Sequence, residues 1–212
     1  DPIKDFTPVA MLQKSYFILM VREQAPWKNV AQLTAAMKDK GEKATYAYGA
    51  PPALASAELY KARAGLKAVG IPYKTSMGSL PEMYSGEIDF QFIDSTAGTP
   101  LLQSGKVRGL AVSSAQRVPN VDLPPMAEAA DMPGFDVAPV WGVFLPANAP
   151  PAIVAKLEGW FAEIGKLDVT RQYMASTNAA PFPGSAKDLA EFLPKEIKKW
   201  EELARLAKIE PQ

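Results

Sequence analysis

Three short segments with hydroxyl, ammonium or carboxylate side chains each follow an apolar strand pattern and precede a helical one. They are Tyr48-Gly49-Ala50, Lys74-Thr75-Ser76 and Asp94-Ser95-Thr96. Backbone N–H groups at the start of a helix bind anions, because the peptide dipoles favour negative charge there. In a parallel sheet such junctions lie at the carboxyl ends of the strands, the usual ligand edge. These residues are therefore candidates for binding a small anion.

Most of these side chains also have a purely structural interpretation. Asp94 is typical of a helix N-cap, and Thr75 and Ser76 are typical of turns. Lys74 is either a solvated charge or the group that neutralises a carboxylate. Tyr48 either packs in the core or stacks on a flat ligand. The sequence leaves these alternatives open.

The loop after Tyr48 reads Gly49-Ala50-Pro51-Pro52. Its two prolines remove two N–H donors, which makes the loop stiffer and more apolar. The loop is therefore expected to favour a ligand that is aromatic or otherwise partly apolar.

Residue types argue against catalysis. The chain has no cysteine and no histidine, which excludes thiolate zinc sites, a cysteine nucleophile and histidine-based triads. Asp89 and Asp94 are five residues apart, on opposite faces of a regular strand. Phosphate-binding and nucleophile-elbow motifs are also missing. We expect no catalytic residue, no metal ligand and no cofactor.

The charge and the hydropathy of the chain argue against nucleic-acid binding and against embedding in a membrane. Lys+Arg and Asp+Glu both number 23, so the formal net charge is zero, and nucleic-acid binding is not expected. Apolar runs such as Tyr16–Val21 are far shorter than the roughly 20 residues that span a bilayer, so the chain is not expected to be membrane-embedded. Its first residues do not read as a signal peptide; we expect a removed signal or a fragment.

From residue 29 to 113, helical and strand patterns alternate. Asn29 is expected to cap the first helix, and Ser79 with Glu82 fits a capping box. Strands that alternate with short helices predict an α/β fold with a mainly parallel sheet and helices on both faces. The predicted strands in this region are 45–48, 68–73, 88–93 and 107–112.

The flanking regions supply too few strands for a second complete layered domain. Strands are predicted at Thr7–Leu12, Tyr16–Arg22 and Val140–Leu145, and helices at about 151–167, after Asp168 and after Ser185. These strands need a sheet to join, so we expect a missing partner segment, most plausibly N-terminal. Trp141 is expected to be buried, as a large aromatic near a crossing strand.

Five segments resemble, in order, the Bug/TctC solute-binding proteins of tripartite tricarboxylate transporters. Asp1–Val9 looks like their "DPxKDFTPV", and the others match a loop-and-helix "YxSxG…LAGEL", "VPYKG", "GGQVD" and "PGFEV…WxG". The matching residues here are Tyr46–Gly49 with Ala55–Leu59, Ile71–Lys74, Ser85–Asp89 and Pro133–Trp141 with Gly142.

The resemblance implies a periplasmic receptor with two α/β lobes, of the type II periplasmic binding-protein kind. It implies that a small organic acid is bound between the lobes and delivered to a membrane permease. By this reading residues 1–19 and 139–212 form a partial lobe one, and residues 20–138 form lobe two. The family's chain has an earlier segment that this sequence lacks, so lobe one is expected to be incomplete.

One rival interpretation shares the two-lobed architecture: the ligand-sensing effector domain of a transcriptional regulator. That reading requires a DNA-binding helix-turn-helix, and no such pattern is visible here. An enzyme is the other rival, and a turnover assay would decide it, because fold analogy alone does not.

Overall fold

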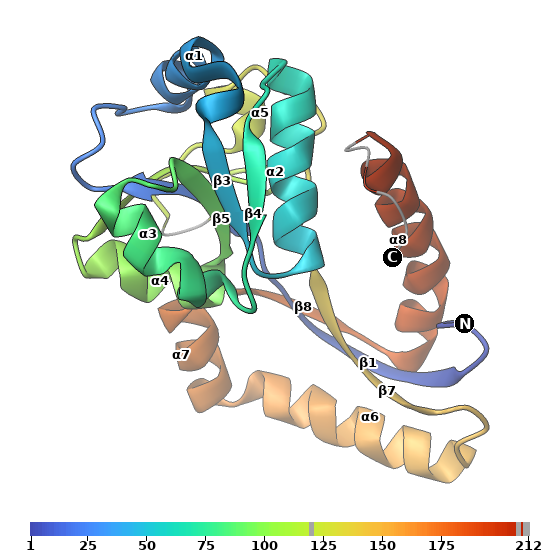
Figure 1. Cartoon of the computed structure of the whole chain (residues 1–212). Coiled ribbons are helices and arrows are strands. Elements are labelled where there is room, and N and C mark those ends of the chain that lie inside the picture. Colours follow the sequence, from blue (N-terminus) through green and yellow to red (C-terminus); the bar gives the residue numbers. More distant parts are fainter. Residues whose placement is uncertain (119–120, 207–208, 210–212) are drawn as a thin grey trace. The chain divides into compact units, whose positions relative to one another are not determined.

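The computed structural model describes residues 1–118, 121–206 and 209, which form two compact units. Unit 1 comprises Asp1–Ser15 and Pro139–Glu202. Unit 2 is built mainly from Tyr16–Ala138. Each unit has its own β-sheet (Figure 1).

Unit 2 contains a five-stranded sheet with the order β4-β3-β5-β2-β6. Strands β4, β3 and β5 run parallel, whereas β2 is antiparallel to both β5 and β6. The predicted α/β fold is confirmed, and the parallel part of the sheet carries the three predicted junctions. The strands are β2 (Phe17–Arg22), β3 (Thr45–Tyr48), β4 (Val69–Pro72), β5 (Phe90–Asp94) and β6 (Val107–Val112).

Side-chain alternation along these strands divides the core of unit 2 into two layers. On one face, Ile18 and Met20 of β2 pack with Leu80 and Met83 of the helix α3. On the other face, aromatic rings contact one another in a row, with centroids 5.6–6.3 Å apart, and Tyr60 of the helix α2 makes the edge-to-face contacts. Helices therefore cover both faces, as Figure 1 shows for α2, α3 and α4. The helices of unit 2 are α1 (Val30–Lys40), α2 (Pro51–Ala64), α3 (Leu80–Ser85), α4 (Ser95–Gln103) and α5 (Met126–Ala129).

Local signals set most helix ends. Asn29 caps α1, because its side chain accepts a hydrogen bond from the Gln32 N–H. The capping box predicted at Ser79 does not form. Ser79 has helical backbone angles, since a short 3₁₀ helix (Ser76–Ser79) precedes α3, and its hydroxyl donates to the Ser76 carbonyl instead.

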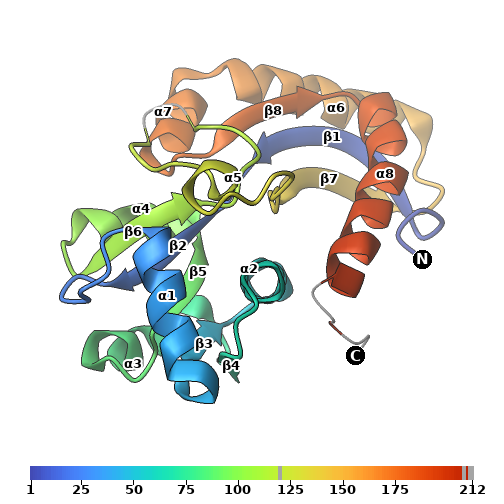
Figure 2. The same ribbon diagram turned by 90° about the horizontal axis from the view of Figure 1, so that it is seen from above.

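Unit 1 contains a three-stranded antiparallel sheet in which β1 (Phe6–Lys14) lies between β7 (Val140–Pro146) and β8 (Ala180–Gly184) (Figure 2). The sequence does not predict β8, because Pro181 and Pro183 interrupt it. Proline is tolerated there because β8 is an edge strand. The helices that follow β7 are α6 (Pro151–Lys166), α7 (Asp168–Ser176) and α8 (Ala186–Leu206).

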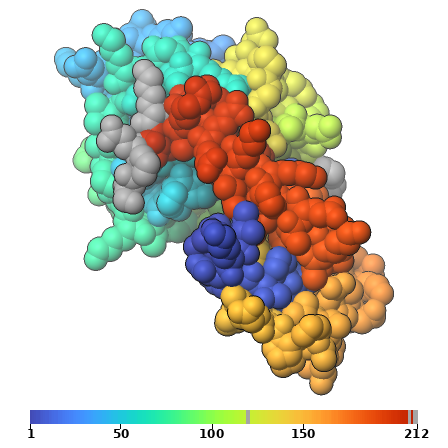
Figure 3. Space-filling view, turned by 90° about the vertical axis from the view of Figure 1, so that its right-hand side faces the viewer, coloured from blue at the N-terminus to red at the C-terminus, as the bar shows by residue number. Residues whose placement is uncertain are grey.

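Unit 1 leaves large apolar side chains exposed. Trp141, predicted to be buried, is 51% exposed on the edge strand β7. Helix α6 has no buried residue, and its apolar residues Ile153, Trp160 and Ile164 are all about half exposed. Figure 3 shows the N-terminal residues (dark blue) beside the α6 region (orange) on this unit. None of the described helices is long and apolar enough to cross a membrane.

Candidate functional site

The three predicted junctions meet at one edge of the unit 2 sheet. Strands β4, β3 and β5 are neighbours and run parallel, so their carboxyl ends lie side by side. Tyr48 ends β3, Lys74 follows β4, and Asp94 ends β5. We call this row the carboxyl edge, defined by residues 48–53, 73–79 and 94–96.

The first two junctions touch each other through Gly49. A Cβ atom on Gly49 would lie 2.1 Å from the Ser76 nitrogen and 2.2 Å from the Thr75 carbonyl carbon. The Tyr73 N–H also donates a 2.9 Å hydrogen bond to the Tyr48 carbonyl. A glycine is required here because only a residue without Cβ permits this backbone contact.

The first junction leads into α2 without a side-chain cap. Ala50 occupies the N-cap position, and Pro51 and Pro52 form the first two helical positions. Proline fits the first turn because its missing N–H would have no helical partner there. Ala53 is the first helical residue with an N–H. Tyr48 is half-buried, with its ring centroid 6.1 Å from that of Tyr46.

The second junction is held by its own side chains and by β5. The Thr75 hydroxyl oxygen accepts a hydrogen bond from the Gly78 N–H at 3.2 Å. The Ser76 carbonyl accepts hydrogen bonds from the Ser79 hydroxyl at 2.9 Å and from the Gln91 side-chain amide at 3.4 Å. Lys74 is exposed, and no described residue forms an ion pair with it. It is therefore available to a ligand.

At the third junction the protein supplies its own carboxylate. Asp94 Oδ1 accepts hydrogen bonds from the Thr96 N–H at 2.9 Å and from the Thr96 hydroxyl at 2.6 Å. The predicted N-cap role of Asp94 is confirmed. Ser95 is fully buried, and its N–H donates to the Tyr16 carbonyl at 2.8 Å.

Two polar residues at this edge were not predicted. Gln91, the second residue of β5, is 1% exposed, and its side chain contacts both Ser76 and Ser79. Tyr16 is 3% exposed beside Ser95. Burial raises the pKa of the Tyr16 hydroxyl well above its usual value, and the nearby charge of Asp94 raises it further. Two sequence features could have indicated these residues. Gln91 is the one amide within the strand Phe90–Asp94, and Tyr16 is a tyrosine at the start of an apolar run.

Asp89 does not pair with Asp94. It is 4% exposed at the other end of β5, where it accepts hydrogen bonds from Lys40 Nζ at 2.5 Å and the Thr45 N–H at 3.0 Å. Five residues of strand separate the two carboxylates by roughly 16 Å. Asp89 thus has a structural role, and the residues that the structure describes include no cluster of acidic side chains able to hold a metal ion.

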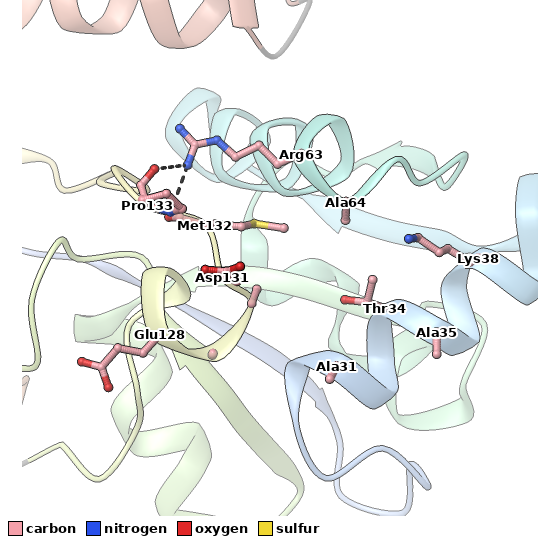
Figure 4. A pocket seen from close by; sticks show the side chains of 12 residues that line it. Ala31, Thr34, Ala35, Lys38, Arg63, Ala64, Glu128, Asp131, Met132 and Pro133 are labelled. Atoms are coloured by element: carbon pink, nitrogen blue, oxygen red, sulfur yellow. Dashed lines mark hydrogen bonds between the residues drawn. The ribbon is translucent and has the colours of Figure 1, made fainter.

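A separate groove of about 930 Å³ lies near the last turn of α2 (Figure 4). Since α2 begins at the carboxyl edge and has 14 residues, the groove is about 20 Å from that edge. The Arg63 side chain points toward the loop that contains Met132 and Pro133, which also lines the groove. It donates hydrogen bonds to the carbonyls of both residues. Its charge is therefore committed to holding that loop.

Comparison with known families gives a match over nearly the whole chain. The family described as "Tripartite tricarboxylate transporter family receptor" (TctC) matches residues 1–208. A protein from the clcB-clcD intergenic region of Pseudomonas knackmussii is 32% identical over 70% of this chain and 88% of its own length. One from the tcbD-tcbE intergenic region of Pseudomonas sp. strain P51 is 29% identical over 94% of this chain. The chain spans about 60% of that relative's length.

Solved structures with the same fold include two with bound acids. Rpa4515 of R. palustris with adipate has a TM-score of 0.92 and 31% identity, over 100% of this chain and 72% of that one. MatC of Rhodopseudomonas palustris with bound malate has a TM-score of 0.85 and 28% identity, over 95% of this chain and 70% of that one. The structure of the periplasmic binding protein BugD is also similar, with a TM-score of 0.88 and 24% identity over 100% of this chain and 72% of that one, so the fold is that of periplasmic binding proteins.

Proposed function

Because the chain belongs to the receptor family of tripartite tricarboxylate transporters, we propose that the protein binds a small carboxylate at the carboxyl edge of unit 2 and does not transform it. The single observation that carries this proposal is the meeting of three strand-to-helix junctions at one edge of the sheet. A carboxylate is stabilised there by backbone N–H groups, since helix dipoles favour negative charge.

The predicted site residues fall into two groups according to the charge of their side chains. The first two junctions carry no carboxylate side chain, and Lys74 adds a positive charge beside them. The third junction already holds the carboxylate of Asp94. We therefore expect a ligand carboxylate at Tyr48–Ala50 and Lys74–Ser76, and a different part of the ligand at Asp94–Thr96.

The first junction favours an acid with an apolar or aromatic body. Two prolines remove donors from its loop, and the half-buried Tyr48 offers a ring on which a flat group can stack. The bound adipate and malate of the two similar structures support the carboxylate class. For this chain we favour adipate-like or aromatic acids over short hydrophilic diacids.

We further propose that the whole protein acts in the periplasm and delivers its ligand to a membrane permease. This step rests on family membership. The two units would then correspond to the two lobes of such receptors, and unit 1 would be completed by further residues that cover its exposed apolar side chains.

Thermal unfolding of the full-length protein with a panel of acids tests the proposal. Benzoate, adipate, succinate and malate form the panel, with glucose as the uncharged control. A ligand that binds only the folded state raises Tm, and the rise grows with the ratio of ligand concentration to Kd. At least one acid is therefore expected to raise Tm while glucose does not. A preference for succinate and malate would contradict the apolar ligand, and no response to any acid would contradict the receptor function.

A further inference from the structure

Two buried hydroxyl groups at the carboxyl edge have no hydrogen-bond partner. In the part of the chain that the structure describes, Tyr16 Oη and Ser95 Oγ are both closed to solvent and unpartnered. An unsatisfied buried hydroxyl destabilises the folded state, and native proteins seldom contain one without a reason. These two atoms therefore call for an additional hydrogen-bonding group.

The two residues belong to the same corner of the sheet. Phe17 pairs with Asp94 across β2 and β5, so Tyr16 lies directly beyond the carboxyl end of β5. The Ser95 N–H donates to the Tyr16 carbonyl, and Ser95 is the first residue of the nine-residue helix α4. The Tyr16 ring packs within unit 2, in a cluster that includes Leu80 and Met83.

The chemistry of this corner disfavours a second carboxylate. Asp94 occupies the start of α4 and already accepts hydrogen bonds from Thr96 N–H and Oγ1, so an anion here would be repelled. The two hydroxyls also lie below the surface, where a charged group would lose its hydration at high cost. A neutral oxygen that accepts or donates hydrogen bonds avoids both penalties.

We infer that Tyr16 Oη and Ser95 Oγ form a subsite for a neutral oxygen of the ligand, a hydroxyl or a carbonyl. The inference rests on the proposed carboxylate-binding function and adds the ligand's second polar group to it. The full ligand class is then a hydroxy or oxo acid whose carboxylate is bound at the first two junctions. Tyr16 and Ser95 are specificity-determining residues in this account.

The test compares Tyr16→Phe and Ser95→Ala with the parent in the full-length protein. Calorimetry measures two pairs of acids that differ by one hydroxyl: 4-hydroxybenzoate with benzoate, and malate with succinate. The parent is expected to prefer the hydroxylated acid of at least one pair by roughly tenfold, the value of one good hydrogen bond. Each variant should lose that preference, so that the two acids of the pair bind it with nearly equal affinity.

Tyr60→Phe is the matched control. The Tyr60 hydroxyl is equally buried, but it shares a 2.7 Å hydrogen bond with the Thr34 hydroxyl on the other face of the sheet. Without ligand, Tyr60→Phe should lower Tm by roughly 2–4 °C, whereas Tyr16→Phe should leave Tm unchanged or raise it. Tyr60→Phe should leave the hydroxyl preference intact.

Three outcomes decide the matter. An equal loss of Tm in Tyr16→Phe and Tyr60→Phe would overturn the inference, because the Tyr16 hydroxyl would then have a partner within the protein. A hydroxyl preference that survives both site variants would also overturn it and leave the receptor function standing. If the parent binds none of the four acids, the subsite inference is overturned, whereas the receptor function fails only if adipate also leaves Tm unchanged.

Discussion

Gly49 is the residue on which the contact between the first two junctions depends. A methyl group there would meet the backbone of Thr75 and Ser76 at 2.1–2.8 Å, and backbone atoms cannot move aside as a flexible side chain can. Gly49→Ala is therefore expected to lower the free energy of unfolding by about 1–3 kcal/mol through overpacking, and to weaken ligand binding. Urea unfolding and calorimetry measure the two effects.

Gly159→Ala is the control for that substitution. Gly159 lies in the exposed helix α6, and a Cβ atom there would have no neighbour within 4 Å. Alanine should stabilise the helix by about 0.5–1 kcal/mol without changing affinity. Equal effects of the two substitutions would refute the contact between the junctions.

At the scale of elements, the Gln91 side chain connects strand β5 to the loop after β4. Its side-chain amide donates to the Ser76 carbonyl, and its carbonyl oxygen contacts the Ser79 hydroxyl. Gln91→Met keeps the volume but removes both contacts, at an expected cost of about 1–3 kcal/mol in unfolding free energy. Hydrogen exchange of the amides at 75–80 should accelerate, because the loop loses its anchor.

Gln116→Met provides the comparison, because Gln116 is exposed. That change should stay within about 0.5 kcal/mol of the parent and leave exchange at 75–80 unaltered. Unchanged exchange in Gln91→Met would mean that the loop is held by its own turn alone.

The elements themselves were largely predictable. Apolar periodicity and end signals such as Asn29 located the helices and strands of unit 2, because local hydrogen bonding sets those ends. Strand β8 escaped prediction, since its two prolines mask an edge strand that exists only through pairing with β1. The parallel direction of β3, β4 and β5 followed from their alternation with helices, whereas the order of the strands and the antiparallel β2 did not.

The site was predictable only in part. The three junctions follow from strand ends, which the sequence marks. The contributions of Tyr16 and Gln91 depend on which partners surround a buried polar group after folding, and no local pattern encodes that. Trp141 was expected to be buried on size alone, but it lies on an edge strand with 51% of its surface exposed.

At the scale of the molecule, buried tyrosines predict sensitivity to alkali. Burial raises the pKa of Tyr60 to about 12 and also raises the pKa values of Tyr16 and Tyr46. Unfolded tyrosine ionises near pH 10, so the unfolded chain releases protons first. These tyrosines make their full contribution to the free energy of unfolding below about pH 10. The contribution declines as the pH rises toward the pKa values of the folded state.

Unfolding free energies between pH 8 and pH 11 would reveal this decline. Tyr60→Phe removes one contributor, so its stability should fall less steeply above about pH 10. Stability that stays constant up to pH 11 would contradict the burial of these hydroxyls.

The most direct test of the receptor account is a crystal structure of the full-length protein with its tightest-binding acid. The account predicts the ligand's carboxylate within hydrogen-bond distance of backbone N–H groups in residues 49–53 or 74–79, at the carboxyl ends of β3 and β4. An acid bound only in the groove near Arg63, or elsewhere away from these junctions, would contradict it.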